Sequence, residues 1–196
     1  MRGKDFPSFK FVACSGATTK SLKSQFKALT PATSLVTITV GGNDLGFVDV
    51  MTTCTLNGNS SCEKRVEKAR VFTRDQLPGR LDTTYAAIKE AAPGAQLVVL
   101  GYPRLFTPND SCRTLSARKR QALNDAADEL SGVVAAAAER AGARYVDVRE
   151  AFADHGVCAN EPWINALTNP TDDSYHPNKA GQAAYLRALT SQLRKL

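Results

Sequence analysis

The chain has 196 residues, 43% of them hydrophobic and 22% charged, and its formal net charge is +6. This length suffices for one domain with a core of ordinary size, and no apolar stretch is long enough to cross a bilayer. We therefore expect a soluble globular protein. Its basic clusters have acidic neighbours and a helical pattern, which favours solvated helix faces over a nucleic-acid-binding patch. The N-terminus, "MRGKDFPSFKF", contains no apolar segment typical of a secretion signal.

Short apolar runs alternate with helical patterns along the chain. Hydrophobic spacing and β-branched content predict strands at 9–13, 34–40, within 93–103 and at 143–148. The same criteria predict helices at 19–29, in two pieces of 62–92 broken near Pro78-Gly79, at 116–142 and at 178–196. This alternation predicts an α/β fold in which helices cover both faces of a parallel sheet. No repeat or linker divides residues 1–196, so we expect a single domain.

Asn43 follows the predicted strand 34–40 in the motif "GGND". The two glycines let the chain turn sharply off a buried strand, which leaves the Asn43 amide at the rim of the sheet. Such a donor, aimed at a developing oxyanion, is worth ~3–4 kcal/mol. The alternative is an ordinary turn, since Asn and Asp are common turn residues. The motif alone leaves both interpretations open.

Asp173 and His176 stand three residues apart in "DDSYHP", just before the last predicted helix. A carboxylate beside an imidazole fixes its tautomer and stabilises the imidazolium that forms when the ring acts as a base. A helix-capping region with a surface histidine is the alternative. The second histidine of the chain, His155, lies in a polar loop.

The chain has five cysteines. Cys54 and Cys62 bracket a polar loop that a disulfide can close, and the loop positions of Cys112 and Cys158 also favour an oxidising compartment. Cys14 is then the odd one. A zinc site is the competing use, because His155 and Cys158 have ligand spacing, but no second close pair accompanies them. We therefore expect no metal.

The blocks "VTITVGGNDLGF" and, far downstream, "DDSYHPNKAGQ" together resemble the SGNH hydrolases, also called the GDSL esterase/lipase family. "FVACSGATT" and the loop-closing cysteines are similar to its secreted bacterial branch. The resemblance implies a flavodoxin-like three-layer α/β/α sandwich. It also implies hydrolysis of small-molecule or lipid carboxylic esters through an acyl-enzyme, without a cofactor, in a secreted protein.

The resemblance assigns roles to individual residues. Gly16 and Asn43 match the family's oxyanion-hole donors, through a backbone N–H and a side-chain amide. His176 matches the general base and Asp173 its acidic partner. In some relatives a backbone carbonyl orients the histidine instead of a carboxylate.

The chain departs from the family at the nucleophile, because it contains no Gly-Asp-Ser block. The segment 9–13 matches the family's second strand. The resemblance therefore implies a chain shortened at its N-terminus, lacking the serine and an internal strand between those at 9–13 and 34–40. It also explains Cys14, whose partner follows the nucleophile block, and pairs Cys54 with Cys62 and Cys112 with Cys158.

Three further expectations concern this shortened form. Ser15 is the candidate substitute nucleophile, whereas Ser174 is poorly placed for His176. The chain should be unstable alone unless strands 9–13 and 34–40 pair directly, and a lid and acyl pocket should come from loops 44–62 and 103–115. The alternative function is a catalytically inactive remnant that binds acyl or glycan ligands, or a partner that supplies the missing strand.

Overall fold

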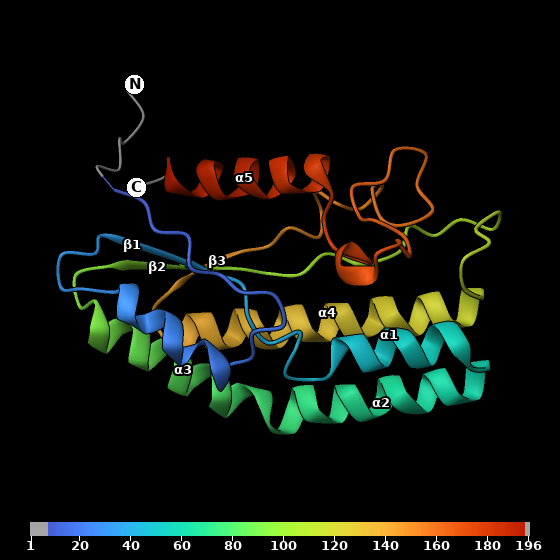
Figure 1. Ribbon diagram of the computed structural model, residues 1–196, viewed down its shortest axis with the longest axis horizontal. Helices are drawn as coiled ribbons and strands as arrows, with labels where there is room; N and C mark the ends of the chain where they lie inside the picture. The colour runs from blue at the N-terminus through green and yellow to red at the C-terminus, as the bar shows by residue number, and fades with distance from the viewer. Residues whose placement is uncertain (1–7, 195–196) are drawn as a thin grey trace.

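A parallel sheet of three strands lies at the centre of the protein (Figure 1). The computed structural model describes residues 8–194. Pairing joins β1 (Leu35–Ile38) to β2 (Gln96–Leu100) and β2 to β3 (Arg144–Val146), so β2 is central. The β-branched run of β2 is buried, with Val98 and Val99 fully covered. Such a strand suits a sheet covered on both faces.

Helices cover both faces of the sheet, as the sequence predicts. Figure 1 shows α5 (Lys179–Leu193) on one face and the other helices on the opposite face. Those helices are α1 (Phe47–Leu56), α2 (Asn59–Asp75), α3 (Leu77–Ala91) and α4 (Ala117–Arg140), with the 3-10 helix η1 (Ser21–Ala28) beside them; a second short 3-10 helix, η2, is Thr171–Asp173. Within residues 8–194, no helix is both long and apolar enough to cross a membrane.

The prediction of a strand at 9–13 is wrong. The segment 8–13 has no regular structure, and Phe9 and Phe11 are 82% and 78% exposed. It does not pair with β1, so the direct pairing of 9–13 with 34–40, on which the stability of the chain alone was expected to depend, does not occur. A β-branched and aromatic run becomes a strand only where a neighbouring strand accepts its backbone hydrogen bonds.

Other boundaries differ more modestly. The helix expected at 19–29 is the 3-10 helix η1, and the loop expected at 44–62 contains α1. The break between α2 and α3 falls at Gln76, not at Pro78-Gly79, because proline is well accepted in the first turn of a helix. The last two residues of the helix predicted at 178–196 lie outside the described residues.

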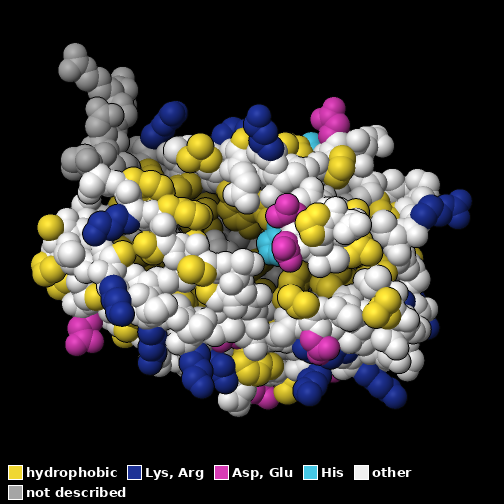
Figure 2. All heavy atoms as spheres, viewed as in Figure 1, with side chains coloured by type: hydrophobic (Ala, Val, Ile, Leu, Met, Phe, Trp, Pro, Cys, Tyr) yellow, Lys and Arg dark blue, Asp and Glu magenta, His cyan; other side chains and the backbone are white. Residues whose placement is uncertain are grey.

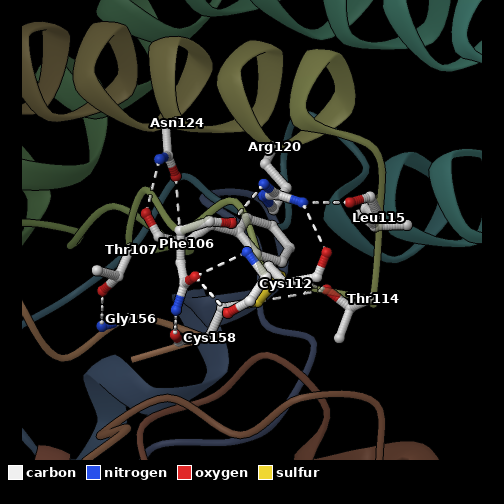
Figure 3. Close-up of a disulfide and its surroundings, with 11 residues drawn as sticks. Phe106, Thr107, Cys112, Thr114, Leu115, Arg120, Asn124, Gly156 and Cys158 are labelled. Carbon is white, nitrogen blue, oxygen red and sulfur yellow. Dashed lines mark hydrogen bonds between the residues drawn. A yellow bond between two sulfur atoms is a disulfide. The ribbon is translucent and has the colours of Figure 1, made fainter. Parts of the chain in front are cut away.

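Both predicted disulfides are present. Cys54–Cys62 joins the end of α1 to the start of α2, and Cys112–Cys158 joins two loops (Figure 3). Cys14 is a free, exposed thiol. Beside the second disulfide, the α4 side chain Arg120 donates to the carbonyls of Leu115, Cys112 and Asn109. The loop before α4 is therefore held both covalently and by this helix.

A carboxylate on α4 joins that helix to α2. Glu129 accepts hydrogen bonds from Arg70 (2.6 Å) and Arg74 (3.0 Å) of α2. Its side chain is only 19% exposed. Burial alone would raise the pKa of Glu129, but the hydrogen bonds from the two guanidinium groups lower it below its ordinary value.

We expect Glu129→Gln to destabilise the fold by about 0.5–1 kcal/mol at pH 7, since the pair is partly exposed. A carboxyl whose pKa is lowered on folding stabilises the fold above its unfolded pKa, about 4.3, and this contribution is lost as pH falls through the folded value. The gap between the two proteins should therefore narrow between pH 7 and pH 3, because pH 3 lies below the unfolded pKa. Urea unfolding at both pH values measures this, with Asp82→Asn as an exposed ion-pair control. An equal gap at pH 7 and pH 3 would contradict the assignment.

Candidate active site

The turn after β1 brings the "GGND" motif to the carboxyl edge of the sheet. Gly41 has φ +121°, a backbone conformation that L side chains rarely adopt. The N–H of Gly42 donates to the Tyr102 hydroxyl at 2.9 Å, just beyond the end of β2. Burial raises the pKa of Tyr102 to about 12, so the phenol remains neutral. The turn is thus held against the neighbouring strand end.

Asn43 and Asp44 hold the segment that follows Gly16. The Asn43 side-chain amide donates to the Ala17 carbonyl at 3.2 Å. The Asp44 carboxylate is fully buried and accepts from the Thr19 backbone N–H (2.9 Å) and hydroxyl (2.5 Å). The two predicted oxyanion-donor segments, Gly16 and Asn43, are therefore tied to each other directly.

His176 is positioned by a short two-stranded ribbon. The backbone N–H of Asn165 donates to the His176 carbonyl at 3.0 Å, and the N–H of Tyr175 donates to the Asn165 carbonyl at 3.2 Å. One step further, the N–H of Asn178 donates to the Trp163 carbonyl. The Asn178 side chain then caps α5 by accepting from Ala180 and Gly181. The capped helix and the ribbon together fix the place of the imidazole.

The His176 ring is oriented by a backbone carbonyl. Nδ1 lies 3.0 Å from the Ser174 carbonyl oxygen. A carbonyl only accepts, so Nδ1 carries the proton and Nε2 has a free lone pair. Asp173 does not take the place predicted for it: it is exposed, and its backbone carbonyl accepts from the His176 N–H and from Asn165.

Tyr175, between Ser174 and His176, adopts φ +60°, a left-handed conformation that is strained for a residue with a side chain. Its buried ring packs against Phe106, with centroids 6.1 Å apart. The α4 side chain Asn124 both accepts from the Phe106 N–H and donates to its carbonyl (Figure 3). Packing against this fixed loop holds the local conformation in which the Ser174 carbonyl meets the imidazole.

Asn43 and His176 line one cavity of about 630 Å³, whereas Gly16, Ser15 and Asp173 are exposed and outside its lining. The lining is mostly apolar and includes no serine among the described residues. Figure 2 shows hydrophobic side chains gathered along a hollow, with histidine and acidic side chains at one end. The volume falls in the usual range of small-molecule sites, about 300–1,000 Å³.

The pair considered for zinc has other roles. Cys158 is bonded to Cys112, and the His155 ring stacks on Trp163 with centroids 3.6 Å apart. The His155 Nδ1 atom also lies 2.9 Å from the Glu161 carbonyl. Within residues 8–194 there is no group of three or more side chains arranged to hold a metal ion.

Sequence reasoning missed two groups that build the site. One is the Asp44 carboxylate. The sequence shows it within "GGND", but no local pattern indicates that its hydrogen-bond partner is Thr19. The other is the Ser174 carbonyl, a backbone group that no residue type signals. In addition, no residue pattern in the stretch "PWIN" (162–165) predicts the ribbon that it forms beside His176.

The fold and site together define a parallel α/β protein with a histidine at the carboxyl edge of its sheet. Residues 3–184 match the GDSL-like Lipase/Acylhydrolase family. The chain is 46% identical to a lipase of Streptomyces rimosus over 186 residues, which covers 93% of this chain and 69% of that protein. The chain therefore belongs to the GDSL-like lipase/acylhydrolase family.

Solved structures agree with this assignment. Phospholipase A1 from Streptomyces albidoflavus NA297 superposes with a TM-score of 0.91 at 44% identity, over 93% of this chain and 79% of that one. An extracellular lipase from Streptomyces rimosus also gives a TM-score of 0.91, at 45% identity, over 93% of this chain and 80% of that one. The predicted α/β fold of the SGNH hydrolases is thus confirmed, with three strands in the sheet among residues 8–194.

We expect Asp44→Ala to destabilise the protein by about 2–4 kcal/mol, because the buried Thr19 N–H and hydroxyl lose their acceptor. Asp49→Ala is the matched control, since that carboxylate is 70% exposed in its ion pair with Arg65 and should cost under about 1 kcal/mol. Equal losses for the two variants in urea unfolding would show that burial of Asp44 is not what matters.

We expect ¹⁵N NMR to find neutral His176 protonated at Nδ1, with Nε2 unprotonated. Asp173→Asn should leave this tautomer unchanged, because the Ser174 carbonyl is its acceptor. Tyr175→Gly should mix the tautomers, since it removes the packing that fixes the turn, whereas Tyr175→Phe should not. A change of tautomer in Asp173→Asn would restore the carboxylate to the role the sequence predicted.

Proposed function

We propose that this chain carries the base and part of the oxyanion hole of a carboxylic ester hydrolase. His176 is the general base, and Asn43 and the Gly16 N–H are the oxyanion donors. The observation that carries the proposal is the Nδ1 contact of His176 with the Ser174 carbonyl, which leaves Nε2 free to take a proton beside the cavity. The lipase and phospholipase A1 named above make an ester the natural substrate class.

The proposal includes the absence of the usual nucleophile from this chain. The cavity lining contains no serine among the described residues, and Ser15 is exposed outside it. The Ser174 hydroxyl accepts a hydrogen bond from the backbone N–H of Thr168 at 2.9 Å. Neither serine is offered to His176, which can then act only on water or on a hydroxyl supplied from elsewhere.

Two further parts rest on the relatives. Leu45 and Phe47, and on the other side Pro103 and Leu105, contribute to the lining, so segments 44–62 and 103–115 shape the acyl pocket. The solved extracellular lipase and the two disulfides support a secreted protein. A second candidate function, a binding module without catalysis, is favoured by the same serine-free lining.

The test is hydrolysis of p-nitrophenyl butyrate by the chain alone. An enzyme without its nucleophile retains some rate over water through the oxyanion hole and binding. We expect a slow rate above buffer. His176→Ala should remove the part of it that comes from water activated by the base, and Asn43→Asp should lower it by at least about tenfold, since one oxyanion donor is commonly worth ~10²-fold or more.

Ser15→Ala is the matched control and should leave the rate unchanged. A fluorophosphonate should form no serine adduct on the folded chain by intact mass. A His176-dependent adduct on Ser15 would mean that Ser15 is the nucleophile. Equal rates in wild type and His176→Ala would show that His176 is not the general base and would favour the second candidate function, a binding module without catalysis.

A further inference from the structure

Two groups of side chains that line the cavity come from α2 and α4, which lie side by side (Figure 1). On α2 they are Val66, Ala69, Arg70 and Thr73, and on α4 they are Leu123, Ala126, Ala127 and Leu130. Both groups have the spacing i, i+3, i+4 and i+7, which belongs to one face of a helix. Together the two faces form one boundary of the cavity, here called the α2–α4 seam, which includes neither β1 nor segment 8–13.

Small side chains line the centre of the α2–α4 seam. Ala69 of α2 and Ala126 and Ala127 of α4 each end in a methyl group. On α4, Leu123 and Leu130 stand about one turn away on either side. Because protein interiors are closely packed, open space next to an alanine exists only where no larger neighbour fills it. The cavity therefore reaches the surface of the two helices at these three alanines, which we call the alanine floor.

The separation of the two helices is held by ion pairs. Glu129 of α4 bonds Arg70 and Arg74 of α2 at 2.6 and 3.0 Å. Arg70, which borders the alanine floor, also lies 3.5 Å from Glu67. Its charge is thus paired with two carboxylates, so an alkyl chain beside it does not isolate an unpaired ion from water.

The proposed reactive groups open onto the same cavity. Asn43 and His176 line it, and so does Phe47, whose ring lies edge-on to the His176 ring with centroids 6.4 Å apart. The acyl chain of an ester held there could run toward the alanine floor or toward α5. Ala69 is 3% exposed, whereas Leu186 of α5 is 60% exposed. A chain on the alanine floor is removed from water more completely, so the hydrophobic effect favours that direction.

The length of the seam limits the length of chain that it can cover. Val66 and Thr73 mark its ends on α2, which are about 10 Å apart at a rise of about 1.5 Å per residue. An extended eight-carbon acyl chain has about the same length, because its C–C bonds are about 1.5 Å long. Methylenes beyond that length would leave the seam and remain in water.

We propose that the α2–α4 seam is the acyl-chain site, that it takes a straight chain of about eight carbons, and that Ala126 is a specificity-determining residue because its methyl group sets the depth of the site. Segments 44–62 and 103–115 then form walls, while the depth comes from α2 and α4. The place of the ester carbonyl, between Asn43 and His176, rests on the proposed function, whereas the binding of the alkyl chain does not.

The experiment titrates the full chain, labelled with ¹³C at its alanine methyl groups, with butyrate, octanoate and dodecanoate below their micelle concentrations. Each buried methylene is worth about fourfold in affinity. Octanoate should therefore bind at least about tenfold more tightly than butyrate, and dodecanoate within about threefold of octanoate. The methyl signals of Ala126 and Ala127 should shift, and that of Ala136, which is exposed on α4, should not.

Ala126→Leu is expected to shorten the site. It should weaken octanoate binding at least about tenfold and leave butyrate binding unchanged. Ala136→Leu is the matched control, since it makes the same substitution on the exposed face of the same helix, and it should change neither affinity. Alanine and leucine both favour helices, so α4 should persist in both variants.

Urea unfolding tests the open space beside Ala126 without any ligand. Ala126→Leu should leave the unfolding midpoint unchanged or raise it, because the added methylenes enter the cavity. Ala137→Leu should lower the midpoint, because Ala137 is fully buried in the packed core. A fall in Ala126→Leu as large as that in Ala137→Leu would show that no room exists there and would overturn the proposal.

Hydrolysis of p-nitrophenyl esters separates this proposal from the proposed function. Chain-length-dependent binding without hydrolysis of the octanoate ester supports the acyl-chain site and counts against His176 as the base. Hydrolysis at equal rates for the butyrate and octanoate esters, with no difference in binding, overturns the acyl-chain site alone. Octanoate that shifts the Leu189 methyl groups of a leucine-labelled sample, and not the alanine floor, places the chain against α5 and also overturns it.

Discussion

The parallel pairing of β1 with β2 is the constraint on which the site depends. Because the two strands run the same way, the turn at Gly42 and the residues after Leu100 emerge at one edge, where the Gly42 N–H meets the Tyr102 hydroxyl. The Asp44 carboxylate then secures Thr19 to this turn. The proposed oxyanion donor Asn43 lies at this edge because β1 and β2 run parallel, and the identity of its side chain then provides the N–H group.

The base reaches the same cavity by an independent route. His176 lies between the 3-10 helix η2 and α5, and its place depends on the ribbon at 163–165 and on the Asn178 cap. Tyr175 links this region to α4 through Phe106 and Asn124. Helix α4 therefore helps to hold the segment that carries His176. The Cys112–Cys158 disulfide closes the loop next to Phe106.

The sequence predicted most of this architecture, for reasons that are local. The runs "LVTI" and "QLVVL" are strands because β-branched residues fit buried, paired backbone, and the stripe of α4 has a helical period. The prediction of a strand at 9–13 is wrong because a strand also needs a neighbouring strand to pair with, and the residues of 9–13 alone do not indicate whether one is present. Asn43 and His176 were found by motif and share a cavity, whereas Asp44 acquired its role only through a partner 25 positions away.

The use of a carbonyl in place of a carboxylate has an electrostatic consequence. The Ser174 carbonyl fixes the tautomer of His176 but carries only a partial charge, so it stabilises an imidazolium less than a carboxylate would. In this structure His176 is exposed, and water can solvate the charged ring.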